Sequence, residues 1–149
     1  MTEPALREFA LKLLARREHA RVELERKLAA RGASSEEIEA VLDDLAAGRL
    51  LSDERYAATR VRARGARYGN ARLARELRAA GVEGELADSV LAGAGDELAR
   101  AAGAWRRRYG SAGLPSDAAE RARQTNFLMR RGFSDETIRR VLRGEHENE

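Results

Sequence analysis

A pattern of apolar residues around a glycine occurs three times in this chain and constrains its fold more than any other feature. The three copies read KLAARGASSEEIEAVL, ELRAAGVEGELADSVL and FLMRRGFSDETIRRVL. In each copy a leucine stands four residues before the glycine (Gly32, Gly81 or Gly132), and a Val-Leu pair begins nine residues after it. Glycine adopts the left-handed conformation that ends many helices, so each copy predicts one helix ending at the glycine and another starting beyond it. The glycines are 49 and 51 residues apart, which is at the upper edge of the range for helical repeats.

The composition favours helix along the whole chain. Apolar residues make up 43% of the 149 positions and aromatic residues only 5%, while Ala, Arg, Glu and Leu dominate. No run of β-branched residues predicts a strand. We therefore predict an all-α protein built as a tandem array of three three-helix repeats, covering residues 5–48, 49–94 and 95–144. An acidic tail, residues 145–149, should be frayed.

Several functional classes find no support in the residues. The chain has no cysteine for a disulfide or a thiolate metal site, and no apolar stretch of signal-peptide or membrane-span length, so we expect a cytoplasmic protein with no membrane contact. His19, in a charged turn, and His146, in the tail, have no evident catalytic partner. We expect no enzyme, cofactor or metal, and interpret Asp43, Asp44, Asp53 and Glu54 as helix-capping or solvated carboxylates.

The charge is unevenly distributed along the chain. The net charge is only +3, yet residues 55–80 contain eight arginines and a single acid, Glu76. Residues 81–98 contain five acids and no base. Two weaker basic clusters, residues 106–108 and 130–131, lie in the third repeat.

The arginine-rich segment is the candidate functional region. On a helix, Arg72, Arg75 and Arg78 share a face roughly opposite Leu73 and Leu77, so their guanidinium groups should project outward. Guanidinium groups bind phosphates or carboxylates through paired donors, which suits nucleic acid or an acidic protein groove. The alternative is an ordinary solvated surface whose arginines pair with neighbouring acids. The predicted partner-binding residues are Arg60, Arg64, Arg67, Tyr68, Arg72, Arg75 and Arg78.

The roles of the aromatic residues differ. Tyr68 could be an exposed contact or could pack locally, and the sequence leaves both open. Trp105 is expected in the core. Arg55 and Arg62 should form a ridge beside the main arginine face.

The motifs in the first two repeats resemble the RecX family, whose members are bacterial regulators of RecA. The first repeat carries Glu23-Leu24 and Lys27-Leu28 before its glycine. The second carries DERYA from Asp53, then a basic–aromatic–glycine stretch that opens an amphipathic basic helix over residues 67–78. The resemblance covers about residues 5 to 142. One departure is the His19-Ala20-Arg21 opening, where the family commonly has a serine cap.

The resemblance implies a curved, elongated array of three-helix units. It implies binding to the RecA nucleoprotein filament and modulation, mainly inhibition, of recombinase, ATPase and coprotease activity, without enzymatic activity and as a monomer. The alternative is a sequence-nonspecific helical protein that binds single- or double-stranded DNA through its arginine surface. The modest net charge and the lack of a clear base-reading helix count against that alternative.

Overall fold

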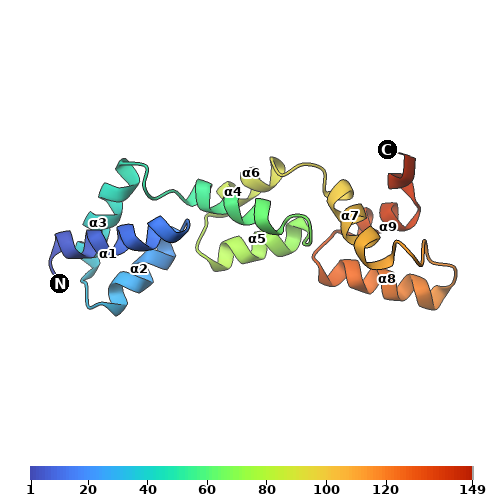
Figure 1. The fold of residues 1–149 in the computed structure, drawn as a ribbon, viewed down its shortest axis with the longest axis horizontal. Coiled ribbons are helices and arrows are strands. Elements are labelled where there is room, and N and C mark those ends of the chain that lie inside the picture. The colour runs from blue at the N-terminus through green and yellow to red at the C-terminus, as the bar shows by residue number, and fades with distance from the viewer. Residues whose placement is uncertain (149) are drawn as a thin grey trace. The chain divides into compact units, whose positions relative to one another are not determined.

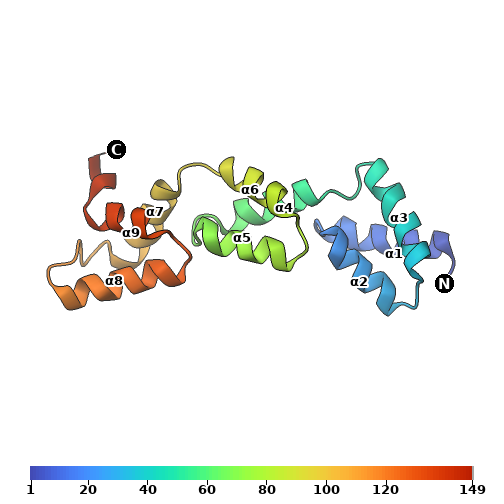
Figure 2. The ribbon, with the colours of Figure 1, turned by 180° about the vertical axis from the view of Figure 1, so that it is seen from behind.

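The computed structural model describes residues 1 to 148, which form nine α-helices and a final 3-10 helix and contain no strand (Figure 1). The first repeat contains α1 (Glu3–Arg16), α2 (Arg21–Ala30) and α3 (Ser35–Ala47). The second contains α4 (Asp53–Arg64), α5 (Asn70–Ala79) and α6 (Gly84–Ala92). The third contains α7 (Glu97–Tyr109), α8 (Ala118–Arg130) and α9 (Asp135–Leu142), followed by η1 (Glu145–Asn148). Figure 2 shows the same helices from behind. The predicted all-α fold with three tandem three-helix units is confirmed.

The repeated Leu-to-Gly spacing has a specific backbone cause. Gly32, Gly81 and Gly132 all have positive φ, between 87° and 90°. In each copy the N–H of the residue after the glycine donates to the carbonyl of the pattern's leucine, as in Val82 to Leu77 at 2.9 Å. This is the Schellman arrangement, which satisfies a free carbonyl at the helix end. The motif therefore marks three helix C-termini of the same geometry.

Side-chain caps fix several helix starts. Ser34 accepts from the Glu37 N–H while Glu37 accepts from the Ser34 N–H, which is the predicted capping box. Helix α2 has no cap from its own N-cap residue, Ala20. Instead the Arg21 N–H donates to the Asp53 carboxylate at 2.8 Å, so an acid from the first turn of α4 replaces the missing serine. Asp53 therefore caps α2 and not its own helix, where the Arg55 N–H donates to the Ser52 hydroxyl instead.

The chain divides into two compact units, and the division runs through the second repeat. Unit 1 comprises residues 1–59 and 77–87, and unit 2 comprises residues 60–76 and the described residues from 88 onward. In unit 1, helices α1, α2 and α3 pack on one another around an aliphatic cluster that includes Leu24, Leu28 and Leu42. In unit 2, helices α7, α8 and α9 pack around a cluster that includes Trp105, Leu128 and Phe133.

The described end of the chain is more ordered than the sequence indicated. His146 is only 4% exposed, its ring centroid lies 5.3 Å from that of Trp105, and its Nε2 donates to the Val141 carbonyl at 3.1 Å. Trp105 is buried as expected and donates to Gln124 at 2.8 Å. The expected frayed tail is wrong for residues 145 and 146, because the Trp105 ring provides an apolar partner that no local pattern reveals. Residue 149, the last of that tail, lies outside the described residues.

His19 is also buried, at 2% exposure, although it lies in a loop between charged residues. Its Nδ1 donates to the Arg17 carbonyl at 3.0 Å, and its Nε2 accepts from Lys27 at 3.2 Å. The ring is therefore a structural element of unit 1.

Among the described helices, none is long and apolar enough to cross a membrane.

Candidate partner-binding surface

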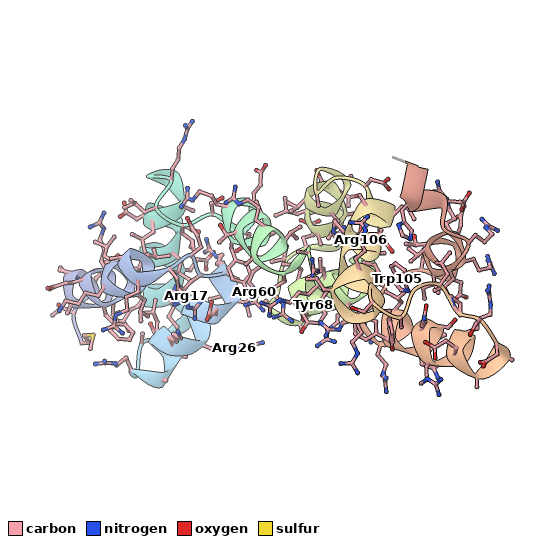
Figure 3. All side chains as sticks on the ribbon, turned by 45° about the vertical axis from the view of Figure 1, so that its right-hand side comes forward. Arg17, Arg26, Arg60, Tyr68, Trp105 and Arg106 are labelled. Atoms are coloured by element: carbon pink, nitrogen blue, oxygen red, sulfur yellow. The ribbon has the colours of Figure 1, made fainter. Side chains whose placement is uncertain are left out.

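The arginine-rich segment, residues 55–80, covers most of α4, the following loop and all of α5. Arg60 and Arg64 are four residues apart on α4 and therefore share a face. Tyr68 lies in the loop, and Arg72 lies in the first turn of α5. Figure 3 labels Arg60 and Tyr68 among these side chains. All of these residues belong to unit 2.

Glu76 holds three of the arginines together. Arg64 binds its carboxylate through two donors, at 2.6 and 2.8 Å. Arg72 lies 3.5 Å from the same carboxylate and Arg60 lies 3.9 Å away. Burial by itself raises the pKa of Glu76, but the hydrogen bonds and charge of Arg64, with those of Arg72 and Arg60, outweigh it and hold this pKa below its usual value. Glu76 therefore stays ionised, and three cations around one anion leave this group positively charged.

The Tyr68 ring is surrounded by guanidinium groups. The Cζ atoms of Arg72 and Arg64 lie 4.2 and 4.4 Å from the ring centroid, and that of Arg131, from the third repeat, lies 5.2 Å away. These distances place all three within cation–π range. Tyr68 is half-buried, so it packs locally and also holds three arginines in place.

The contacts continue into the third repeat as an alternating series of cations and rings. Arg131 lies over Phe127 as well as Tyr68, at 5.0 Å from the Phe127 centroid. Arg108 lies over the other end of the series, 5.7 Å from the Phe127 centroid. We call this series the guanidinium–ring ladder: Arg72, Tyr68, Arg131, Phe127 and Arg108. It joins residues that lie up to 63 positions apart in the chain, as with Tyr68 and Arg131.

Arg100 fastens the loop after α4 to α7. Its Nε donates to the Gly65 carbonyl at 2.7 Å, Nη1 to the Asn70 side chain at 2.6 Å, and Nη2 to the Tyr68 carbonyl at 2.7 Å. Burial lowers the pKa of Arg100 from its usual value, although an arginine remains charged in proteins. The three acceptors compensate for its partial desolvation.

The loop also touches the glycine that ends α8. The Gly69 N–H donates to the Arg131 carbonyl at 2.7 Å. A Cβ atom on Gly69 would collide with the Gly132 carbonyl, and one on Gly132 would collide with the Arg72 side chain. Both positions therefore require glycine for a close backbone approach, which sets the position of the loop on the third repeat.

A cavity of about 370 Å³ opens beside this contact. Its walls contain four arginines, two rings and one alanine, which are Arg67, Arg107, Arg108, Arg131, Tyr68, Phe127 and Ala104. Arg107 also donates to the Ala66 carbonyl. No acidic residue lines this cavity.

The structure does not bring all the predicted site residues together in one compact unit. Arg60, Arg64, Arg67, Tyr68, Arg72 and Arg75 lie in unit 2, whereas Arg78 lies in unit 1. Arg75 and Arg78 are exposed, as expected, but Arg72 is not a freely projecting side chain. It is half-buried because it contacts Glu76 and Tyr68 and donates to the Arg130 carbonyl at 3.3 Å. That these residues bind a partner stays a prediction.

Four contributors were missed or ranked too low from the sequence: Arg100, Arg107, Arg108 and Arg131. Arg107, Arg108 and Arg131 belong to the two clusters considered weaker. Their nearness to Tyr109 and Phe127 was the available signal, since basic and aromatic residues interleave there. Nothing local marked Arg100, whose acceptors lie at least 30 residues away.

Three family models match the chain in succession. The first three-helix domain of RecX matches residues 7–45, the second matches residues 52–91, and the third matches residues 95–142. The chain belongs to the RecX family. The helical repeats of the RecX models thus correspond to α1–α3, α4–α6 and α7–α9.

Individual relatives agree over nearly their full lengths. The chain is 48% identical over 147 residues to regulatory protein RecX of Leptothrix cholodnii, covering 97% of this chain and 92% of the relative. It is 48% identical over 143 residues to the RecX of Pseudomonas fluorescens, covering 94% and 91%. The crystal structure of RecX from Lactobacillus salivarius superposes with a TM-score of 0.79 at 20% identity over 95% of each chain, which shows the shared fold. The relatives' name, regulatory protein RecX, supports a regulatory role for the family.

Proposed function

We propose that this chain is a non-enzymatic modulator, mainly an inhibitor, of the recombinase, ATPase and coprotease activities of RecA, acting by binding to the RecA filament. Membership of the RecX family supports a regulatory role. The observation that carries the proposal is the excess of cations between residues 60 and 76, where six arginines accompany one acid. A surface of this kind steers association with an acidic groove and strengthens binding to it.

The exposed arginines of this segment are the contacts we expect. Arg75 is exposed on α5, and the Arg60 side chain on α4 is 45% exposed. Arg64 and Arg72 act mainly as supports, because Glu76 and Tyr68 already occupy their guanidinium groups. A binding test should therefore change Arg60 and Arg75.

The test is DNA-dependent ATP hydrolysis by RecA with the double variant Arg60→Glu and Arg75→Glu. Reversing both charges should weaken inhibition at least tenfold, because attraction to an acidic groove becomes repulsion. The matched control is Arg121→Glu with Arg139→Glu, which makes the same charge change at exposed positions on α8 and α9. If the two double variants inhibit equally well at the same salt concentration, the segment is not the RecA contact.

A second arm separates action on RecA from coating of DNA. RecA and its single-stranded DNA are held at fixed concentrations while double-stranded DNA is raised into excess. A protein that binds the filament should still inhibit, whereas a protein that only covers DNA loses its effect in proportion to the added lattice. Inhibition that disappears with added DNA would reject the RecA-directed mechanism.

A further inference from the structure

We propose that the cavity in unit 2 binds single-stranded nucleic acid, with a phosphodiester on its guanidinium groups and an unstacked base against its rings and guanidinium planes. This inference goes beyond the proposed function, because it concerns a ligand that this chain should bind without RecA. The cavity residues that carry it are Arg67, Tyr68, Arg107, Arg108, Phe127 and Arg131.

The charge of the cavity selects an anion. Four of its residues are arginines, and none of the four forms an ion pair within the part of the chain that the structure describes. The arginines around Glu76 differ, because there a carboxylate from the chain itself already occupies the donors. Guanidinium edges match phosphate oxygens through paired donors, so the cavity retains capacity for a phosphate.

The aromatic rings of the cavity favour a nucleotide over an acidic peptide as the anion. The Cζ of Arg131 lies within cation–π distance of both the Tyr68 and the Phe127 ring, and that of Arg108 lies over Phe127. A cation–π contact does not give the guanidinium group a carboxylate partner, so Arg131 and Arg108 are held beside the rings while their N–H groups can still bind an incoming anion. An acidic peptide would use only the charges. A nucleotide offers a phosphate and a flat ring together, and bases stack on both aromatic rings and guanidinium planes.

A single strand fits this combination better than a duplex does. In a duplex the bases are stacked inside and only the phosphates face the protein, so the rings of the cavity would find no partner. In a single strand a base can leave its neighbours and enter a recess. The expected preference is therefore for single-stranded over double-stranded DNA of the same length.

The cavity is held open by contacts that do not need the ligand. Arg100 binds the Gly65 and Tyr68 carbonyls, Gly69 binds the Arg131 carbonyl, and Arg107 binds the Ala66 carbonyl. The ligand therefore need not order the loop, which lowers the free-energy cost of binding.

The experiment is fluorescence anisotropy of a labelled oligothymidylate titrated with the full chain, in the absence of RecA. Arg108→Gln and Arg131→Gln should each weaken binding about tenfold, the scale expected for a charge-assisted hydrogen bond. Each should also reduce the slope of log affinity against log salt by about 0.7, the value for one phosphate contact on a single strand. The matched control, Arg121→Gln with Arg139→Gln, removes two exposed arginines of unit 2 away from the cavity and should change the slope by less.

A ring variant tests the base contact separately. Phe127→Leu should weaken binding about tenfold with an unchanged salt slope, because it removes stacking and leaves the charges in place. Circular dichroism checks that it folds, and the two glutamine variants decide the matter if it does not.

Three results would overturn the proposal. The first is equal losses in the cavity variants and the control variant. The second is equal affinity for a duplex of the same length, with the same response to Phe127→Leu. The third is binding of oligoglutamate, but not of oligothymidylate, through the cavity arginines, which would assign the cavity to an acidic protein segment. Binding of oligothymidylate that depends on Arg108, Arg131 and Phe127 supports it.

Discussion

Arg100 and His19 show how single polar side chains hold loops that the apolar core does not reach. Arg100 supplies three donors to acceptors on one loop and on the first residue of α5. His19 joins the Arg17 carbonyl to the Lys27 ammonium group inside unit 1. Each side chain acts through the number and direction of its hydrogen bonds.

Arg100→Lys should destabilise the chain although it keeps the charge. An ammonium group has no planar fork of donors, so at least one of the Gly65 and Tyr68 carbonyls loses its partner. We expect a loss of about 1–3 kcal/mol in the free energy of unfolding, measured by urea denaturation followed by circular dichroism. Arg139→Lys, at an exposed position on α9, is the control and should unfold like the wild type. Equal midpoints for the two variants would show that the fork geometry does not matter.

His19 should make unit 1 less stable as the pH falls. Burial lowers the pKa of this imidazole from about 6.5, the Arg17 carbonyl and Glu23 oppose that shift, and the charges of Arg17 and Lys27 add to it. The folded chain therefore binds this proton less tightly than the unfolded chain does. The contribution of the neutral ring is complete above the unfolded-state pKa and is lost as the pH falls through the lower folded-state pKa.

The measurement compares the wild type with His19→Gln, which keeps one donor and one acceptor but does not titrate. Between about pH 8 and about pH 5.5 the free energy of unfolding should fall more steeply for the wild type. All other titrating groups are common to both proteins, so the difference reports His19. Parallel curves would contradict the assignment.

At the scale of the helices, local caps determine where helices begin and end, and one long-range contact determines where the α4–α5 loop docks. The Schellman turns after α2, α5 and α8 follow from a local pattern. In each, a leucine is followed four residues later by a glycine, and an apolar residue comes directly after that glycine. The docking of the α4–α5 loop depends on Gly69 meeting Gly132, which is a contact between two distant loops.

Gly69→Ala should therefore be costly, whereas Gly84→Ala should not. The new Cβ atom would collide with the Gly132 carbonyl, a backbone atom that can move only if the loop moves. We expect a loss of roughly 1–3 kcal/mol in the free energy of unfolding, as for overpacking. We also expect lower affinity of the cavity for oligothymidylate. Gly84→Ala is the matched control, because a Cβ atom there meets nothing within 4 Å. If both variants unfold at the same urea concentration, the loop contact is looser than the structure shows.

The difference between these two kinds of contact explains what could be predicted from the sequence. The helices were predictable because each cap and apolar stripe is set by residues within about one turn, as with Ser34 and Glu37. The candidate cations around Glu76 were found through their density in the sequence. The ladder was not predictable, because which loop Arg131 meets depends on the packing of helices more than 50 residues apart. Arg100 was missed for the same reason, and His146 because Trp105 lies 41 residues before it.

At the scale of the whole molecule, the apolar interior is made mainly of leucine and alanine, with few large rings. Aromatic residues are 5% of the chain, and Trp105 is its only tryptophan. Each compact unit has its own buried cluster, so a single large-to-small change removes a sizeable share of the local apolar contact.

Leu77→Ala tests this thin interior. Leu77 is 2% exposed, so its truncation should cost about 2–5 kcal/mol and lower the melting temperature by several degrees, measured by circular dichroism. Leu50→Ala makes the same chemical change at a residue that is 43% exposed, and should cost well under 1 kcal/mol. A Leu77→Ala protein that melts like Leu50→Ala would place Leu77 on the wrong face of α5.

The contact between Gly69 and Gly132 limits how chains of this kind can be recombined. A chimera that exchanged only residues 95–142 for the corresponding part of a relative would set a foreign turn against the native one, and any side chain at either glycine would collide. The transferable module is therefore not the three-helix repeat that the sequence pattern suggests. It is the third repeat together with residues 65–76, so hybrids in which both segments come from the same parent should fold more often than hybrids in which only residues 95–142 are exchanged.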